Sequence, residues 1–415
     1  MSDENGQKKG PLVGLKVIEM GMLYAGPLVA SNLSDLGADV IKIEPPRGDE
    51  VRHSGEHKDG HSLWWRITNR NKRIIAADVK TAEGAELVRR LARDADVLIE
   101  NFRPGRIAEW GFSYETLKAI NPGIVVLHIS GYGQEGPYKG RPGMGTLAEA
   151  FSGYAHVTGE PDRPPMLPLF PLADPVAALF GTYSALAAIY ARAHNGGVGD
   201  EIDISLYEPL LNMLGPLVPY YDQLGRVSER QGNLTAWSVP RGAFLTRDRK
   251  WVAVAGAANA VAVRIFAAIE REDMAKDPEL QNSLGRIKRA EEVNAAIADW
   301  IGGHTLDEVL ERFVAHNVLV APVQDAKQLF ENEHVKARGT IARLPDPDLG
   351  SIAMQNVVPK FRNQPGAIRW PARTTVGQDT WEVLAELGYA EVEIEDLKGK
   401  GIVAGPDKAL NTTIS

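Results

Sequence analysis

The first 130 residues alternate short β-rich runs with stretches of helical periodicity, and this alternation is the strongest constraint on the fold. Runs rich in Val and Ile stand at 15–20, 39–44, 73–79, 96–100 and 123–130, and helical patterns fill 25–36 and 81–94. Strands that alternate with helices in this way predict a parallel sheet covered by crossover helices on both faces. We therefore expect a Rossmann-like large domain of the α/β class.

A change in composition near residue 226 indicates a second domain. The polar segment 226–241 is followed by a predicted hairpin at 242–256 and by helical patterns at 257–270, 287–302 and 305–317. The end of the chain returns to extended segments around 340–345 and 356–361, then to helices near 379–387 and 391–401. We expect a large domain from 1–225, completed by 335–415, and a small α+β domain at 226–334.

The composition excludes several classes of function. A net charge of -8 argues against a nucleic-acid partner, and the absence of cysteine removes thiolate catalysis and Cys-ligated zinc. The histidines at 53, 57 and 61 are too loosely spaced to predict a metal site. The longest uncharged apolar stretch, 175–191, is shorter than the roughly 20 residues of a bilayer span. Without an apolar signal core at the N-terminus, we expect a cytoplasmic protein with no membrane contact.

Three further features concern a binding site. The first strand-to-helix turn, "EMGMLYAGP", lacks the G-x-G-x-x-G pattern, which disfavours a nicotinamide or flavin cofactor. The Gly/Pro-rich segment 131–145 is long for a connector and is expected to border a site. Asp174 followed by Pro175 is typical of a helix start, so we expect Asp174 to be the N-cap. The helix terminus would then favour its ionised form.

Six segments in order carry a resemblance to a known family: "LKVIEMGMLYAGPLVASNLSDLGADVIKIEPP", "NRNKRIIAADVKTAEG", "DVLIENFRPGRIAEWGF", "HISGYGQEGPYKGRPG", "LADPVAALFGTYSALAAIYAR" and "WEVLAELGYAEVEIEDLKGKGIV". In these segments the chain resembles the class III CoA-transferases, of the formyl-CoA transferase and carnitine CoA-transferase type. The resemblance implies an interlocked homodimer that uses coenzyme A as a substrate and holds no permanent cofactor.

The resemblance also implies roles for individual residues. The residue at the place of Asp174 is the nucleophile of the family, and it forms aspartyl-anhydride and aspartyl-CoA thioester intermediates. The implied CoA contacts are Tyr24, Ala25, Ala77, Asp78, Lys80, Asn101, Phe102, Arg103, Arg141 and Met144. Because a dicarboxylate acceptor needs a cation for its far carboxylate, Arg47, Arg52 and Arg73 are candidate substrate-binding residues.

Two more segments narrow the expected substrates. "GRPGMGTLAEAFSGYAHVTGEP" and "YEPLLNMLGPLVPYYDQLG" resemble the subgroup that uses succinyl-CoA and small dicarboxylates such as malate or citramalate. The expected activity is CoA transfer from an acyl-CoA, succinyl-CoA in the first place, to a small carboxylic or dicarboxylic acid. An α-methylacyl-CoA racemase is one alternative, although "GRPGMGTL" lacks the His that a racemase needs. A non-catalytic CoA-binding homologue and a lyase are the others.

Overall fold

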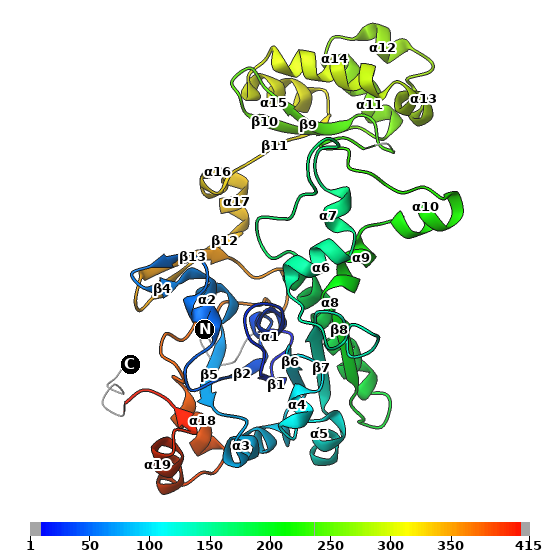
Figure 1. Cartoon of the computed structure of the whole chain (residues 1–415). Helices are drawn as coiled ribbons and strands as arrows, with labels where there is room; N and C mark the ends of the chain where they lie inside the picture. The colour runs from blue at the N-terminus through cyan, green and yellow to red at the C-terminus, as the bar shows by residue number, and fades with distance from the viewer. Residues whose placement is uncertain (1–9, 236, 408–415) are drawn as a thin grey trace. The chain divides into compact units, whose positions relative to one another are not determined.

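The computed structural model describes residues 10–235 and 237–407, which form two compact units. The first unit comprises the chain up to 152, then 168–215, and then the chain from 337. The second comprises 153–167 and 216–336. The N-terminal segment on which the expected location partly rested, residues 1–9, lies outside the described residues. Figure 1 gives the labels of the helices and strands used below.

A seven-stranded sheet is the centre of the first unit. Its strands are β1 (Lys16–Glu19), β2 (Asp39–Glu44), β5 (Lys72–Ala77), β6 (Val97–Glu100), β7 (Val125–Ser130), β8 (Glu201–Ser205) and β14 (Val403–Ala404). Their order is β14-β5-β2-β1-β6-β7-β8. All neighbouring pairs are parallel except β14 with β5. The predicted α/β class and the mostly parallel sheet are confirmed, and the antiparallel edge strand was not expected.

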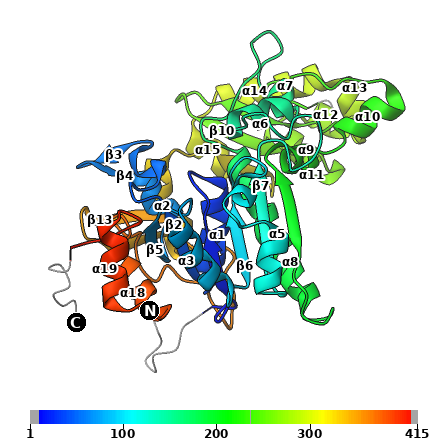
Figure 2. The same ribbon diagram turned by 60° about the horizontal axis from the view of Figure 1, so that its bottom comes forward.

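Helices cover both faces of this sheet, as the alternation of strands and helices predicts. On one face α1 (Ala25–Asp35) and α8 (Ala173–Arg192) pack against each other. On the other lie α3 (Ala82–Ala92), α5 (Tyr114–Ile120), α18 (Thr380–Glu386) and α19 (Glu391–Gly399). Figure 2 shows α18 and α19 beside β5, so the end of the chain completes this unit. Val17 and Ile18 face opposite cores because successive strand residues point to opposite faces.

Short elements complete the first unit. They are the 3₁₀ helix at Glu50–His53, β3 (His57–Lys58), β4 (His61–Ser62), α2 (Leu63–Thr68), α4 (Arg106–Glu109), α6 (Gly145–Phe151), α9 (Tyr207–Met213), β12 (Ile341–Asp346) and β13 (Gly350–Gln355). The extended segment expected at 340–345 is β12, but 356–361 forms no strand and β13 precedes it. Pro359 explains part of the error, because proline lacks the N–H that a ladder requires.

The second unit has its own sheet and its own core. Antiparallel β9 (Arg241–Leu245), β10 (Trp251–Ala255) and β11 (Leu319–Pro322) contain the hairpin expected at 242–256. Its helices are α7 (Tyr154–Val157), α10 (Leu217–Leu224), α11 (Asn259–Ala268), α12 (Glu272–Lys276), α13 (Ser283–Lys288), α14 (Ala290–Gly302), α15 (Leu306–Ala315) and α16 (Ala326–Glu331), and α17 (Glu333–Arg338) follows at its boundary. Phe266, Ile297 and Phe313 are fully buried in this core. Among the described helices, none is both long and apolar enough to cross a bilayer.

Candidate active site

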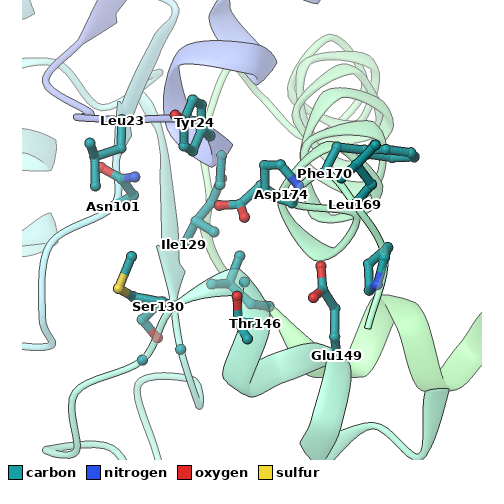
Figure 3. Close-up of a pocket in the computed structure, with 18 residues that line it drawn as sticks. Leu23, Tyr24, Asn101, Ile129, Ser130, Thr146, Glu149, Leu169, Phe170 and Asp174 are labelled. Atoms are coloured by element: carbon teal, nitrogen blue, oxygen red, sulfur yellow. The ribbon is translucent and has the colours of Figure 1, made fainter. Parts of the chain in front are cut away.

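A cavity of about 370 Å³ lies beyond the carboxyl ends of the central strands. It is lined by Leu23 after β1, Asn101 after β6, Gly131 after β7 and Leu206 after β8. In the sheet, β2 lies on one side of β1 and β6 lies on its other side, so the strand order reverses direction at β1. Open α/β sheets bind ligands at such a switch in strand order. Figure 3 shows Asp174 and Glu149 among the residues around this cavity.

Asp174 lies in the first turn of α8, and its carboxylate is largely buried. The helix begins at Ala173, its N-cap is Leu172, and Leu172 makes no side-chain cap. The expectation that Asp174 is the N-cap is therefore wrong. Glu149 of α6 takes this part, because its Oε1 accepts hydrogen bonds from the backbone N–H groups of Leu172 (2.7 Å) and Ala173 (3.2 Å).

The surroundings of Asp174 favour its protonated form. Burial, with the negative charge of Glu149, raises the pKa of Asp174 to about 7, although its own backbone N–H acts in the other direction. The helix start favours the ionised form through this N–H, as expected, but desolvation and the charge of Glu149 outweigh it. The consequence is chemically useful, since a carboxylate with a higher pKa is a stronger base and nucleophile that is still partly ionised near pH 7.

The Gly/Pro-rich loop borders the cavity, as expected, through Gly131, Gly143, Met144 and Gly145. Gly131 and Gly143 lie so close that a Cβ on either would overlap the backbone of the other, so the loop closes at this point. Inside the loop segment, the Tyr132 ring contacts the ring of Tyr138 at a centroid distance of 5.7 Å. The loop is therefore packed against itself.

Gly145 leaves room for the Asp174 carboxylate. A Cβ placed on Gly145 would overlap Oδ2 of Asp174. We predict that Gly145→Ala lowers kcat by roughly 100-fold with little change in fold, because the Asp174 carboxylate must rotate away from its present position in the cavity wall. The check is steady-state kinetics beside Gly140→Ala, a control in the same loop where an added Cβ meets no atom within 4 Å. Equal activity of both variants would contradict this role.

The turn that carries Tyr24 is held from two sides. The Asn101 side chain donates to the carbonyl of Met22 and accepts from its N–H, both at 2.8 Å. Lys42 donates to the carbonyl of Gly21 at 2.7 Å, and Asp49 accepts from the N–H of Leu23 at 3.4 Å. Leu23 has φ +63, a left-handed conformation that non-glycine residues seldom adopt. The contacts around it stabilise this turn at the cavity wall.

Behind the turn lies a fully buried charge cluster of Glu19, Lys42, Lys72 and Asp49. The two carboxylate oxygens of Glu19 accept from Lys42 and Lys72, each at 2.7 Å, and Lys42 lies 2.8 Å from Asp49. Burial lowers the pKa of Lys72 to about 8, and Glu19 offsets only part of this effect. For Lys42 the same burial is outweighed by Asp49 and Glu19, which raise its pKa above the usual value. The cluster anchors β1, β2 and β5 to the turn.

A second cavity, of about 420 Å³, lies in the same unit at the ends of β2 and β5. It contains four of the CoA contacts that the resemblance implies, Ala77, Asp78, Lys80 and Phe102, and the candidate substrate-binding residue Arg47. Phe102 and Trp110 meet edge to face at a centroid distance of 4.9 Å, which makes one aromatic wall. Lys80 and the exposed Arg47 supply cations at this cavity.

The other predicted residues are distributed as follows. Tyr24, Ala25, Asn101, Met144 and Asp174 line the first cavity. Arg52 binds both carboxylate oxygens of Glu44, and Arg73 binds Asp39 and Glu386. Arg103 is exposed after β6, and Arg141 stacks on Tyr138 at 3.5 Å. Among the described residues that line the first cavity there is no lysine, arginine or histidine. The substrate roles of the three candidate arginines stay predictions.

Sequence reasoning missed Glu149, Thr146, Phe170 and Trp110, which all line one of the two cavities. A weak signal existed for Glu149, because it stands one helical turn after Gly145 and so faces the same side of α6. Within the described part of the chain, no group of three His, Cys, Asp or Glu side chains is arranged to hold a metal ion.

Comparison with known proteins decides the family. The model of CoA-transferase family III matches residues 12–380. The chain belongs to this family. The resemblance drawn from the six sequence segments is thereby confirmed, and so is the expectation of an enzyme that transfers CoA.

Several known proteins are similar to this chain over nearly their whole length. The succinyl-CoA–D-citramalate CoA-transferase of Chloroflexus aurantiacus is 36% identical over 95% of this chain and 98% of its own. The succinate–glutarate CoA-transferase of Agrobacterium fabrum is 32% identical over 92% and 97%. A CAIB/BAIF family protein from Brucella suis has a crystal structure with a TM-score of 0.80 at 30% identity, covering 92% of this chain and 100% of its own.

Proposed function

We propose that this enzyme transfers CoA from succinyl-CoA to a small carboxylic or dicarboxylic acid, with Asp174 as the nucleophile. One observation carries the proposal: a buried carboxylate with a pKa near 7 stands at the first turn of a helix, in a cavity at the switch point of the sheet. Carboxylate nucleophiles need activation, and desolvation supplies it here.

The proposed reaction proceeds by two symmetrical exchanges. A carboxylate oxygen of Asp174 attacks the thioester carbonyl, a C–O bond forms, the C–S bond breaks, and CoA thiolate leaves. The thiolate then attacks the aspartyl carbonyl of the anhydride, which releases succinate and leaves an aspartyl-CoA thioester. The acceptor carboxylate displaces CoA from this thioester, and the returning thiolate attacks the acceptor carbonyl, so that acyl-CoA leaves and Asp174 is restored. No step requires net proton transfer.

The two cavities suggest how CoA is divided between them. The thioester belongs in the first cavity, beside Asp174, and the charged and aromatic parts of CoA belong in the second. There Lys80 and Arg47 suit phosphate groups, and the Phe102–Trp110 pair suits a planar ring. Asn101 and Phe102 are adjacent in sequence after β6, and each lines one of the two cavities.

The donor and the class of acceptor rest on the relatives. The similar enzymes carry the names succinyl-CoA–D-citramalate and succinyl-CoA–L-malate CoA-transferase, and their identities to this chain are 36 to 37%. The described lining of the first cavity holds no cation for a far carboxylate, so the proposed dicarboxylate acceptor requires one from outside this lining.

We also propose that the enzyme is a homodimer, as the family resemblance implies. Leu179, Tyr183 and Tyr190 of α8 lie four and seven residues apart and form a stripe in which each side chain is more than half exposed. An apolar stripe of this kind favours contact with another polypeptide.

The test is to incubate the protein with succinyl-CoA and a panel of acids, with malate, citramalate, glutarate and oxalate among them, and to identify new CoA esters by mass spectrometry. Transfer to at least one dicarboxylic acid supports the proposal. Exchange of an α-proton in deuterated water without any transfer favours the racemase alternative, and loss of a β-substituent favours a lyase. CoA binding without any conversion favours a non-catalytic homologue.

A further inference from the structure

The first turn of α8 is held by a side chain from another helix. Glu149 lies on α6 and is 2% exposed. Its Oε1 accepts from two consecutive N–H groups, those of Leu172 and Ala173, which immediately precede Asp174. These N–H groups have no partner inside α8, because the first turn of a helix lacks the preceding carbonyls. Glu149 therefore determines where the backbone of this turn lies.

The other end of α6 reaches the loop that lines the cavity. α6 begins at Gly145, whose lack of a Cβ leaves space for the Asp174 carboxylate. Ala148 and Ala173 pack in one core, so α6 and α8 contact each other through apolar atoms as well as through Glu149. Figure 3 shows the Glu149 side chain directed from α6 toward the start of α8. A displacement of Glu149 would thus move Asp174.

We propose that Glu149 is a positioning residue for the Asp174 nucleophile: it holds the first turn of α8 at the cavity and places a second negative charge beside the reacting carboxylate. The inference rests on the proposed role of Asp174. Glu149 has two separable effects, because its hydrogen bonds hold the backbone and its charge acts on Asp174. Glu149 is buried in the wall of the cavity, where it supports Asp174.

Few other groups act on this carboxylate. Among the described residues that line the cavity, the ionisable ones are Tyr24, Glu149 and Asp174. Tyr24 stands in the turn before α1, and burial raises its pKa above 10, so it stays neutral where Asp174 titrates. Glu208 of α9, the next helix packed on α6 and α8, accepts from the Ser205 hydroxyl at 2.6 Å. Substitution of Glu149 is therefore the direct way to change the charge that acts on Asp174.

Two substitutions separate the two effects. Glu149→Gln keeps an amide oxygen that accepts from Leu172 and Ala173 but removes the charge. We expect its kcat at high pH to stay within roughly threefold of wild type, while the acid limb of the pH–rate profile moves to lower pH by roughly one unit. Glu149→Ala removes both effects, and we expect kcat to fall roughly 10- to 100-fold with KM for succinyl-CoA within about threefold.

The experiment measures pH–rate profiles of wild type, both Glu149 variants, Asp174→Ala and Glu115→Gln, an exposed acid on α5 that serves as control. Circular dichroism checks the fold of each, and Glu149→Gln keeps the test open if Glu149→Ala does not fold. The inference is overturned if the acid limb of the profile does not move in Glu149→Gln, or if kcat is unchanged in a folded Glu149→Ala. In either case an inactive Asp174→Ala still supports the proposed function. If Asp174→Ala retains transfer, the proposed function fails first.

Discussion

Replacing Asp174 with alanine is expected to reduce CoA transfer by at least about 10³-fold, because the proposed mechanism then has no covalent acceptor for the acyl group. Among the described residues that line the cavity, Glu149 is the only other residue with a carboxylate. The measurement is the rate of formation of new CoA ester from succinyl-CoA. Trapping of an aspartyl-CoA thioester on a peptide that contains residue 174 should succeed in wild type alone.

The matched control is Asp94→Ala, because Asp94 is an exposed acid whose ion pair with Lys16 lies at the other end of the strands. Its transfer rate should equal that of wild type. An Asp174→Ala enzyme that still forms new CoA ester at a tenth of the wild-type rate or more would place the nucleophile elsewhere.

The same carboxylate should make the native state less stable as the pH rises. The pKa of Asp174 is about 7 in the folded protein against about 3.9 in an unfolded chain, so between these values the folded state binds more protons than the unfolded state. The free energy of unfolding therefore falls with rising pH in this window. Asp174→Asn, which stays neutral, should be more stable than wild type by about 2 to 4 kcal/mol at pH 8 and equally stable near pH 4. Urea denaturation at both pH values measures this difference.

Replacing Glu19 with glutamine should destabilise the protein by about 3 to 5 kcal/mol, which is the second large effect. Glu19 is fully buried and is the shared counter-charge of Lys42 and Lys72. Glutamine keeps the shape but leaves two buried ammonium groups with Asp49 as their one carboxylate partner in the cluster. Urea unfolding, read as a change in midpoint at constant slope, measures the loss.

The control for Glu19 is the same substitution at an exposed ion pair. Glu109 pairs with Arg106 on α4 at 2.7 Å, with both side chains more than half exposed. Glu109→Gln should change the free energy of unfolding by less than about 1 kcal/mol, because solvent screens such pairs. Similar losses in both variants would contradict the structural role of the buried cluster.

Much of the fold could be read from the sequence where local pattern and burial agree. The strand at 125–130 is mostly apolar and buried throughout, which is typical of a parallel sheet covered on both faces. The strand at 39–44 carries Val and Ile between charged residues, and β2 matches its predicted bounds in full. β14 was not predicted because a strand of two residues is too short to show the alternation of a β-strand. Its partner β5 is also far away in the sequence. β13 was not predicted either, and its pairing with β12 depends on the turn between them.

By itself the sequence determined the fold class, the family and the residues expected around Asp174. Four of these, Tyr24, Ala25, Asn101 and Met144, line one cavity with Asp174. Only the tertiary structure decided how Asp174 is held and ionised, because burial and the approach of Glu149 depend on the packing of α6 against α8. Helix propensity depends on residues that are close in sequence. The pKa of Asp174 and the capping of α8 by Glu149 depend on residues that are close in space, and the assembled core brings these together.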